Sequence, residues 1–318
     1  MIQANRGYLI IGKQTAKGTA TTPTLSIPFQ SEGFSTDHSV SILTEGQDNN
    51  YKKSNVKMMH TENFSYTLYP RPNQLAYMFG WFLGDDAVTG GADPYTHVMT
   101  KSDRAWLTLE RKLDTSVVQR LYDAKIESLT LSGEAGQPIS MSIAGQACNV
   151  TIIATERTES YEDRNPFMFY NGIGRFKFAT TVDRLINSFN ISFSVSGGGL
   201  TDDTFQVVDL LDLDYDIEMS AGFITEDTTR WKNINYYGTT IPSENVYTAA
   251  FELNCWYPQT STRQVKVTIP LIKYQPLGLN LSGAVNTMRE EVAGVAEKQA
   301  TTELATITCM NNIATTII

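Results

Sequence analysis

The residue types that could support catalysis or metal binding are few and widely spaced in this chain. There are three histidines, His38, His60 and His97, and no two of them have the spacing of a helical zinc site. A Ser-His-Asp site needs no sequence adjacency, but no Gly-x-Ser-x-Gly segment supports one. The glycines at 197–199 follow a predicted strand without opening a helix, which favours a hairpin turn over a phosphate loop. We therefore predict no catalytic residue, no cofactor and no metal ion.

The densest group of charges is an alternating run of four carboxylates: Asp212, Asp214, Asp216 and Glu218. Its spacing resembles a calcium loop, but Ile217 stands where that loop needs glycine and Phe223 where it needs glutamate. In a strand, all four carboxylates would lie on one face. Two interpretations stay open: a solvated face that discourages edge aggregation, or an anionic wall facing a channel. Glu127 and Glu134 are weaker candidates for the same wall.

The composition is that of a folded protein, with 41% hydrophobic and 19% charged residues, and the length allows two buried cores. A net charge of −9 argues against gripping nucleic acid through its phosphates, although not against letting it slide past. We expect no signal peptide and no transmembrane helix. Cys148, Cys255 and Cys309 are odd in number and far apart, which favours reduced, buried thiols in a cytosolic product over a disulfide.

Most of the chain alternates apolar and polar residues with a period of two, which predicts half-buried antiparallel strands. The apolar positions of four such segments are 64, 66 and 68; 139, 141 and 143; 189, 191, 193 and 195; and 265, 267, 269 and 271. The polar positions between them are rich in serine and threonine, which suit a wet strand face.

Two segments are predicted to be helical. Residues 72–83 begin with a proline and stop at Gly84. Residues 226–236 follow Thr225 as a possible N-cap and close at Gly238. We interpret the aromatic residues of the first helix as helix-on-sheet packing rather than as a cofactor site.

The sequence also repeats itself. Residues 129–133 (Leu-Thr-Leu-Ser-Gly) return at 279–283 as Leu-Asn-Leu-Ser-Gly, and a strand, a turn and a helix follow one another in both 62–84 and 214–238. We therefore predict a mainly β fold of two tandem duplicated antiparallel β-sandwich or partial-barrel modules, each with a flanking α-helix. The predicted divisions are an N-terminal arm (1–30), module 1 (31–150), a linker (151–185), module 2 (186–312) and a C-terminal tail (313–318). The tail is apolar, which predicts that it docks on something.

Several strand segments, in their order, resemble one known family. Residues 106–112 (Trp-Leu-Thr-Leu-Glu-Arg-Lys), 122–133 and 138–146 look like the middle of the tail tube proteins of long-tailed bacteriophages. Residues 12–20 resemble the N-terminal arm of that family, and 266–272 with a last strand near 305–310 resemble its end. Each motif is a strand pattern with little specificity alone, but the similarity spans nearly the whole chain.

This resemblance implies rings whose inner strands form a continuous inter-subunit β-barrel around a DNA channel. Single-module members form six-subunit rings, so two modules per chain imply a trimer with pseudo-sixfold symmetry, with a hexamer as the alternative. The implied location is the virion tail, after synthesis in the host bacterial cytoplasm. The implied partners are further copies of the chain and the tape measure, tail terminator and distal tail proteins, with DNA passing through the lumen unbound.

The resemblance also implies that rings stack through the terminal arms and the long polar loop at residues 44–55. The candidate loop residues are Glu45, Asp48, Tyr51, Lys52 and Lys53. The lumen-lining candidates are the six carboxylates named above. Two other classes of protein remain as alternatives: a soluble hydrolase or carbohydrate-binding β-sandwich and, less favoured, an outer-membrane porin.

Overall fold

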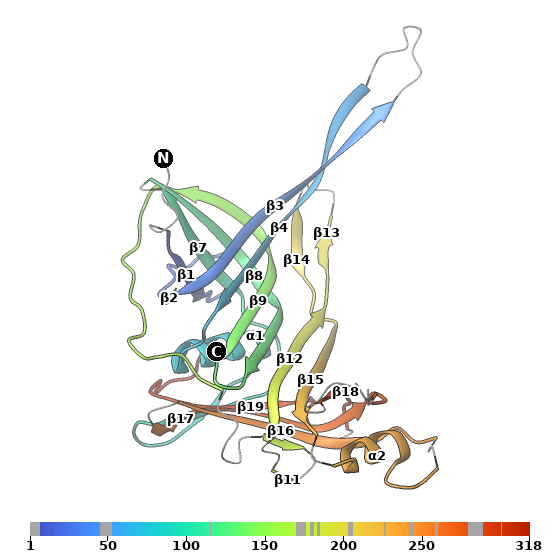
Figure 1. Ribbon diagram of the computed structural model, residues 1–318. Helices are drawn as coiled ribbons and strands as arrows, with labels where there is room; N and C mark the ends of the chain where they lie inside the picture. Colours follow the sequence, from blue (N-terminus) through green and yellow to red (C-terminus); the bar gives the residue numbers. More distant parts are fainter. Residues whose placement is uncertain are drawn as a thin grey trace.

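The computed structural model describes most of the chain, and within that part the protein is mainly β, with two helices (Figure 1). The described residues are 7–44, 53–114, 116–169, 176–178, 181–182, 185–202, 206–225, 227–241, 244–257, 260–278, 289–299 and 301–318.

The first repeat contains β1 (Leu9–Lys13), β2 (Leu25–Ile27), β3 (Phe29–Thr44), β4 (Lys53–Leu68), α1 (Pro72–Leu83), β5 (Ala87–Thr89), β6 (Tyr95–Met99), β7 (Leu107–Asp114), β8 (Val117–Glu134) and β9 (Ser140–Ile153). The second repeat contains β10 (Phe176–Phe178), β11 (Thr181–Val182), β12 (Ile186–Ser196), β13 (Gly199–Thr201), β14 (Val207–Leu210), β15 (Asp214–Ile224), α2 (Thr229–Tyr236), β16 (Thr248–Tyr257), β17 (Thr260–Tyr274), β18 (Arg289–Ala296) and β19 (Thr306–Asn311).

Strand pairing confirms the tandem duplication. In the first repeat the antiparallel order is β1-β7-β8-β9-β4-β3. In the second repeat it is β10-β16-β17-β18-β15-β12, which is the same series with each strand replaced by its counterpart. The helices also match, since α1 follows β4 and α2 follows β15. Residues 279–283, the second copy of the Leu-x-Leu-Ser-Gly segment, lie outside the described residues. The predicted module boundaries stay predictions.

The two repeats form one body rather than two separate modules. The N-terminal half of β8 pairs with β7, and its C-terminal half pairs along the same edge with β12 of the second repeat. β19, near the end of the chain, pairs with both β17 and β6. The largest hydrophobic cluster accordingly draws on both repeats, whereas the chain length alone had allowed two cores. Figure 1 shows β16, β17 and β19 crossing beneath the upright strands β3, β4, β8, β9, β12 and β15.

Helix α1 has the predicted bounds. Pro72 occupies its first turn, and Gly84 closes it at φ +86, in the left-handed region that favours glycine. A side chain at Gly84 would also collide with the Asp103 carbonyl, because its Cβ would lie 2.0 Å from that oxygen. Phe79 and Phe82 of α1 pack on strand residues, as interpreted above, while Tyr77 and Trp81 contact each other.

Helix α2 is shorter than predicted, and the expectation of a start at residue 226 after a Thr225 cap is wrong. The helix begins at Thr229 after Thr228, because β15 stays paired with β18 up to Ile224 and the Asp227 carboxylate accepts the Thr229 N–H at 2.8 Å. It ends where Tyr237 takes a left-handed conformation, one residue before Gly238.

The predicted alternation fails at one point in β17. Ile269 pairs with Phe251, but the next core position is Ile272, paired with Ala249, so β17 holds one extra residue there. Pro270 lies in this bulge, where a residue without a backbone N–H is tolerated. Leu271 is therefore only half-buried, while Ile272 enters the core.

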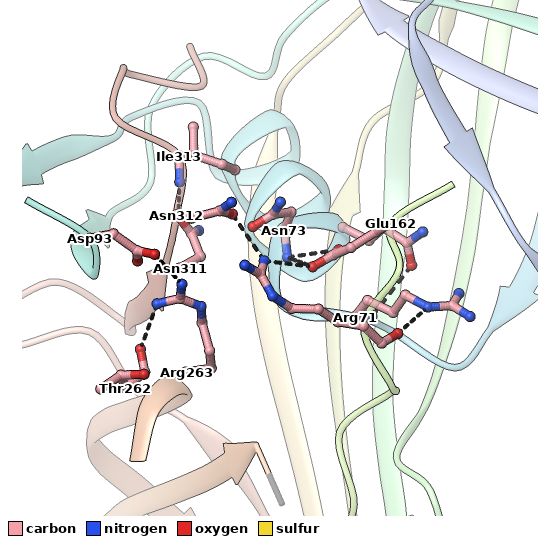
Figure 2. A network of polar contacts seen from close by, with 11 residues as sticks. Arg71, Asn73, Asp93, Glu162, Thr262, Arg263, Asn311, Asn312 and Ile313 are labelled. Carbon is pink, nitrogen blue, oxygen red and sulfur yellow. Dashed lines mark hydrogen bonds and ion pairs between the residues drawn. The ribbon is translucent and has the colours of Figure 1, made fainter. Parts of the chain in front are cut away.

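The segment after β9 and the C-terminal tail are held against α1 (Figure 2). The predicted linker (151–185) includes the end of β9 and all of β10 and β11. Between them, Glu162 accepts the Asn73 N–H at 3.1 Å, and Arg164 donates to Asn312 at 3.0 Å. The tail docks as predicted, because Ile317 is buried beside Gly80 and donates its N–H to the buried Asp86.

The close approach of β8, β9 and β4 gives a steric prediction. A Cβ at Gly145 would lie 2.2 Å from the Lys125 carbonyl oxygen and 2.5 Å from the Phe64 ring. We expect Gly145→Ala to lower the free energy of unfolding by roughly 1–3 kcal/mol, measured as a shift in the urea midpoint. Gly198→Ala is the matched control, since its Cβ would meet nothing within 4 Å. Equal midpoints for the two variants would contradict the steric argument.

Candidate functional site

One exposed sheet face carries small polar side chains across both repeats. The sheet has the strand order β3-β4-β9-β8-β12-β15-β18-β17. Directly paired residues form rows that cross these strands. The first row is Ser31, Thr67, Ser142, Thr130, Ser192 and Glu218, and the second is Gly33, Ser65, Ala144, Ser128, Ser194 and Asp216. A shorter third row is Ser140, Ser132, Asn190, Ser220 and Ala293.

These three polar rows share chemistry as well as position. Hydroxyl groups of adjacent strands contact each other: Thr67 and Ser142 at 3.2 Å, and Thr130 and Ser192 at 3.2 Å. Shallow hollows in the same face are lined by row residues of both repeats. From β3 to β15 these rows contain no lysine or arginine, and their only charges come from β15. Beyond β15 the first row continues through Val295 of β18 to Lys273 of β17, which is ion-paired with Glu297 at 2.6 Å. From β3 to β15 the face can therefore hydrogen-bond water but offers no cation to an anionic ligand.

The carboxylates of β15 lie on this face. Asp214, Asp216 and Glu218 are exposed, while Ile217 and Met219 point into the core, as the strand interpretation predicted. β4, the counterpart of β15 in the first repeat, carries Asn63, Ser65 and Thr67 at exposed or half-buried positions. Of these two counterpart strands, only β15 carries negative charge on this face.

Asp212 does not share this face, and the expectation that all four carboxylates align is wrong. It precedes β15, and its carboxylate is ion-paired with Arg104 and, at 2.9 Å, with Lys125. The side chains of these two cations are only 1% and 8% exposed, so both need a buried anion. The neighbouring Leu213 is 65% exposed, because the strand alternation starts only after it.

The environment of Asp212 changes its titration. Burial alone would raise the pKa of this carboxyl, but the hydrogen bond from Lys125 and the charge of Arg104 outweigh burial and hold the pKa below its ordinary value. Arg104 also donates to the carbonyls of Ile126 and Leu211. The cluster therefore fixes the chain just before β15 to β8 of the first repeat.

The two weaker wall candidates lie in different surroundings. Glu127 is the extra residue of a bulge in β8, because Ile126 pairs with Gly145 and Ser128 with Ala144. It is half-buried, and burial raises the pKa of its carboxyl despite the charge of Arg104. Glu134 is exposed at the end of β8, opposite Ser188 of β12.

The loop candidates cannot be located on the structure. Glu45, Asp48, Tyr51 and Lys52 lie outside the described residues, and Lys53 is described only as the first residue of β4. The β3–β4 ladder continues to the Thr44–Lys53 pair, and Figure 1 shows this two-stranded ribbon projecting well beyond the rest of the sheet.

Other chemistry is sparse in the described part of the chain. No group of three or more His, Cys, Asp or Glu residues there could hold a metal ion. Cys148, Cys255 and Cys309 are buried thiols rather than a disulfide pair. Among the helices described, none has the length and apolar character needed to cross a membrane.

The comparison with known families identifies the chain. A family model described as phage tail tube protein matches residues 4–253. The chain belongs to this family. The match covers the whole first repeat and runs into β16, so it includes the pairing of β8 with β12. No curated protein matches the chain. The family resemblance is confirmed: this is a structural protein of the phage tail tube, located in the virion tail, and nothing supports the hydrolase, carbohydrate-binding or porin alternatives.

The Asp212 cluster of this tail tube protein gives a pH-dependent prediction. Asp212→Asn leaves Arg104 and Lys125 without their anion, which we expect to cost about 3–5 kcal/mol at pH 7. Because folding lowers the pKa of Asp212 below its ordinary 3.8, the stabilisation is present above that pH and is lost as the pH falls through the folded value. The free energy of unfolding in urea should therefore be higher for the wild type than for Asp212→Asn, and this difference should become smaller below about pH 4.

The control for that experiment is Asp216→Asn, which changes an exposed carboxylate of β15 by the same chemistry. We expect it to alter the unfolding free energy by less than about 0.5 kcal/mol. If Asp212→Asn lowers the free energy of unfolding by the same amount at every pH, packing rather than charge stabilises the cluster.

Proposed function

We propose that this protein assembles into rings that stack as a hollow tube, and that the polar rows line the channel through which viral DNA passes. The family membership and the polar face support this proposal. The role is structural rather than enzymatic. The partners are further copies of the chain and the tape measure, tail terminator and distal tail proteins, and synthesis takes place in the host bacterial cytoplasm before the protein joins the tail.

The chemistry of the polar rows suits a conduit. DNA is bound mainly through its phosphates, by lysine and arginine, and the rows contain neither from β3 to β15. Asp214, Asp216 and Glu218 would repel phosphates, and the small hydroxyl side chains keep the surface wet and smooth. DNA would therefore slide past without specific contacts. Asp212 is excluded from the proposed lining by its ion pairs, and Glu127 by its half-buried bulge.

Ring closure follows from the duplication. The contact between repeats is a row of seven antiparallel residue pairs from β8 to β12. β3 is the counterpart of β12, and in the described residues it pairs only with β4, so its other edge is open. A strand edge of this length favours pairing with another chain. We propose that the open edge of β3 pairs with the second repeat of a neighbouring copy, so that the sheet closes around the channel.

Three chains supply the six repeats that such a ring needs, with six chains as the alternative. In the three-chain ring, acidic stripes from β15 would alternate with uncharged stripes from β4. Native mass spectrometry of the isolated ring should give three times the 35.4 kDa of one chain. Six chains would refute the trimer and leave the tube intact, whereas a protein that forms neither rings nor tubes would refute the assembly itself.

The channel lining is tested by charge reversal. Asp216→Lys with Glu218→Lys would place lysines on the wall of every ring, and we expect DNA ejection to slow by roughly tenfold or more at low salt, with relief at high salt. Asp163→Lys with Glu303→Lys is the matched control, since both carboxylates are exposed away from the polar rows. Unchanged ejection by the first variant would place β15 on the outside of the tube.

A further inference from the structure

The two helices occupy the same place in the two repeats but differ sharply in burial. Ten of the twelve residues of α1 are buried. In α2 only Ile234 is buried, although the helix follows β15 as α1 follows β4. The helices differ in their own residues, since α2 is mostly polar, and they differ in what lies against them.

Strands of the next repeat cover part of α1, alongside β6, β8, β19 and the C-terminal tail. Phe79 and Phe82 of α1 contact Phe193 of β12, with ring centroids 5.4 and 6.4 Å apart. Phe82 also contacts Tyr215 of β15, at 5.8 Å. Because β12 and β15 belong to the second repeat, α1 is a junction helix that is completed only where the first repeat meets the second.

Helix α2 and the residues after it form an apolar surface that nothing in the described chain covers to the same extent. Trp231 and Tyr236 contact each other at 5.0 Å on the half-buried side of the helix. Tyr237, Ile241 and Val246 are 48%, 72% and 54% exposed. Figure 1 shows α2 at the margin of the molecule, away from α1. Trp231 already packs against the main hydrophobic cluster, so we call the three exposed residues, Tyr237, Ile241 and Val246, the α2 surface.

We propose that the α2 surface docks against a second copy of this chain, on β3 and β4 near their pairing edge. These strands are the counterparts of β12 and β15, so the junction between chains would reproduce the junction that α1 makes within one chain. The inference rests on the proposed ring, in which the repeat that follows α2 is the first repeat of the neighbouring copy. It adds a contact to strand pairing: an apolar anchor at each boundary between chains.

The partner of the α2 surface is inferred from the duplication of the fold, and not only from the exposure of the surface. Large exposed apolar groups that lie together mark interaction sites, but they do not identify the partner. Here the internal junction identifies it, because the same series of strands precedes both helices and the strands that cover α1 have counterparts in the same polypeptide. Contact with a stacked ring, or with a different tail protein, is an alternative that the experiment separates.

The test compares two aspartate substitutions at exposed isoleucines. Ile241→Asp places a charge in the α2 surface, and Ile152→Asp is the matched control at a residue 58% exposed on β9. We expect Ile241→Asp to raise by at least tenfold the concentration at which half of the chains are in rings, measured by analytical ultracentrifugation. The control should form rings as wild type does. Circular dichroism and thermal melting of both variants should match the wild-type monomer.

Hydrogen exchange of the wild-type protein gives a second readout that needs no substitution. Backbone amides of α2 should exchange at least tenfold more slowly in isolated rings than in monomers. If Ile241→Asp forms rings normally and α2 exchanges equally fast in both states, the inference is wrong while the ring stands. If the variant forms rings that fail to stack, the surface contacts the next ring and the inference is also wrong. If the wild-type protein forms no rings, the proposed assembly fails together with it.

Discussion

The pairing of β8 with β12 is the constraint on which the rest of the structure depends. Along one edge, this strand of eighteen residues pairs with β7 of its own repeat over its N-terminal half and with β12 of the second repeat over its C-terminal half. This arrangement extends one sheet through both repeats and sets the polar residues of neighbouring strands in register. A shift of one residue in this pairing would turn the serines and threonines of one repeat into the core. The uninterrupted polar face therefore depends on the register of this one pair of strands.

Buried contacts reinforce the pairing from both sides of the sheet. On the core side, the aromatic residues of α1 pack against Phe193 and Tyr215, so a helix of the first repeat is completed by strands of the second. Before β15, Asp212 forms ion pairs with both Arg104 and Lys125. Such a cluster adds little net stability compared with an apolar core, but it specifies one arrangement, because either cation would be costly to bury alone. The C-terminal tail adds a further tie, since His97 bridges the Asp86 carboxylate and the Ile313 carbonyl.

A tube protein needs little chemistry on its channel face and much complementarity at its boundaries, and the residues are distributed accordingly. The polar rows consist of hydroxyl, amide and small side chains with acidic groups on one strand. The titratable clusters lie away from them, between repeats or under the tail. Because both repeats have the same order of paired strands, the contact between the two repeats of one chain indicates how two neighbouring chains would pair. In a single chain, the open edge of β3 and the exposed α2 surface lack the partners that β12 and α1 have at the contact between repeats.

Local patterns in the sequence determined the elements. Alternation predicted the strands around Phe64, Ile191 and Val267, Pro72 and Gly84 bounded α1, and the order of strand motifs indicated the family, because these signals depend on neighbouring residues alone. Tertiary structure decided the rest. The inward turn of Asp212 depends on Arg104, over a hundred positions away, and the late start of α2 depends on the β15–β18 ladder. Pairing between distant strands also made one body of the two repeats. Strand spacing carries no information about which edges meet, since that choice is made by packing between residues far apart in the chain.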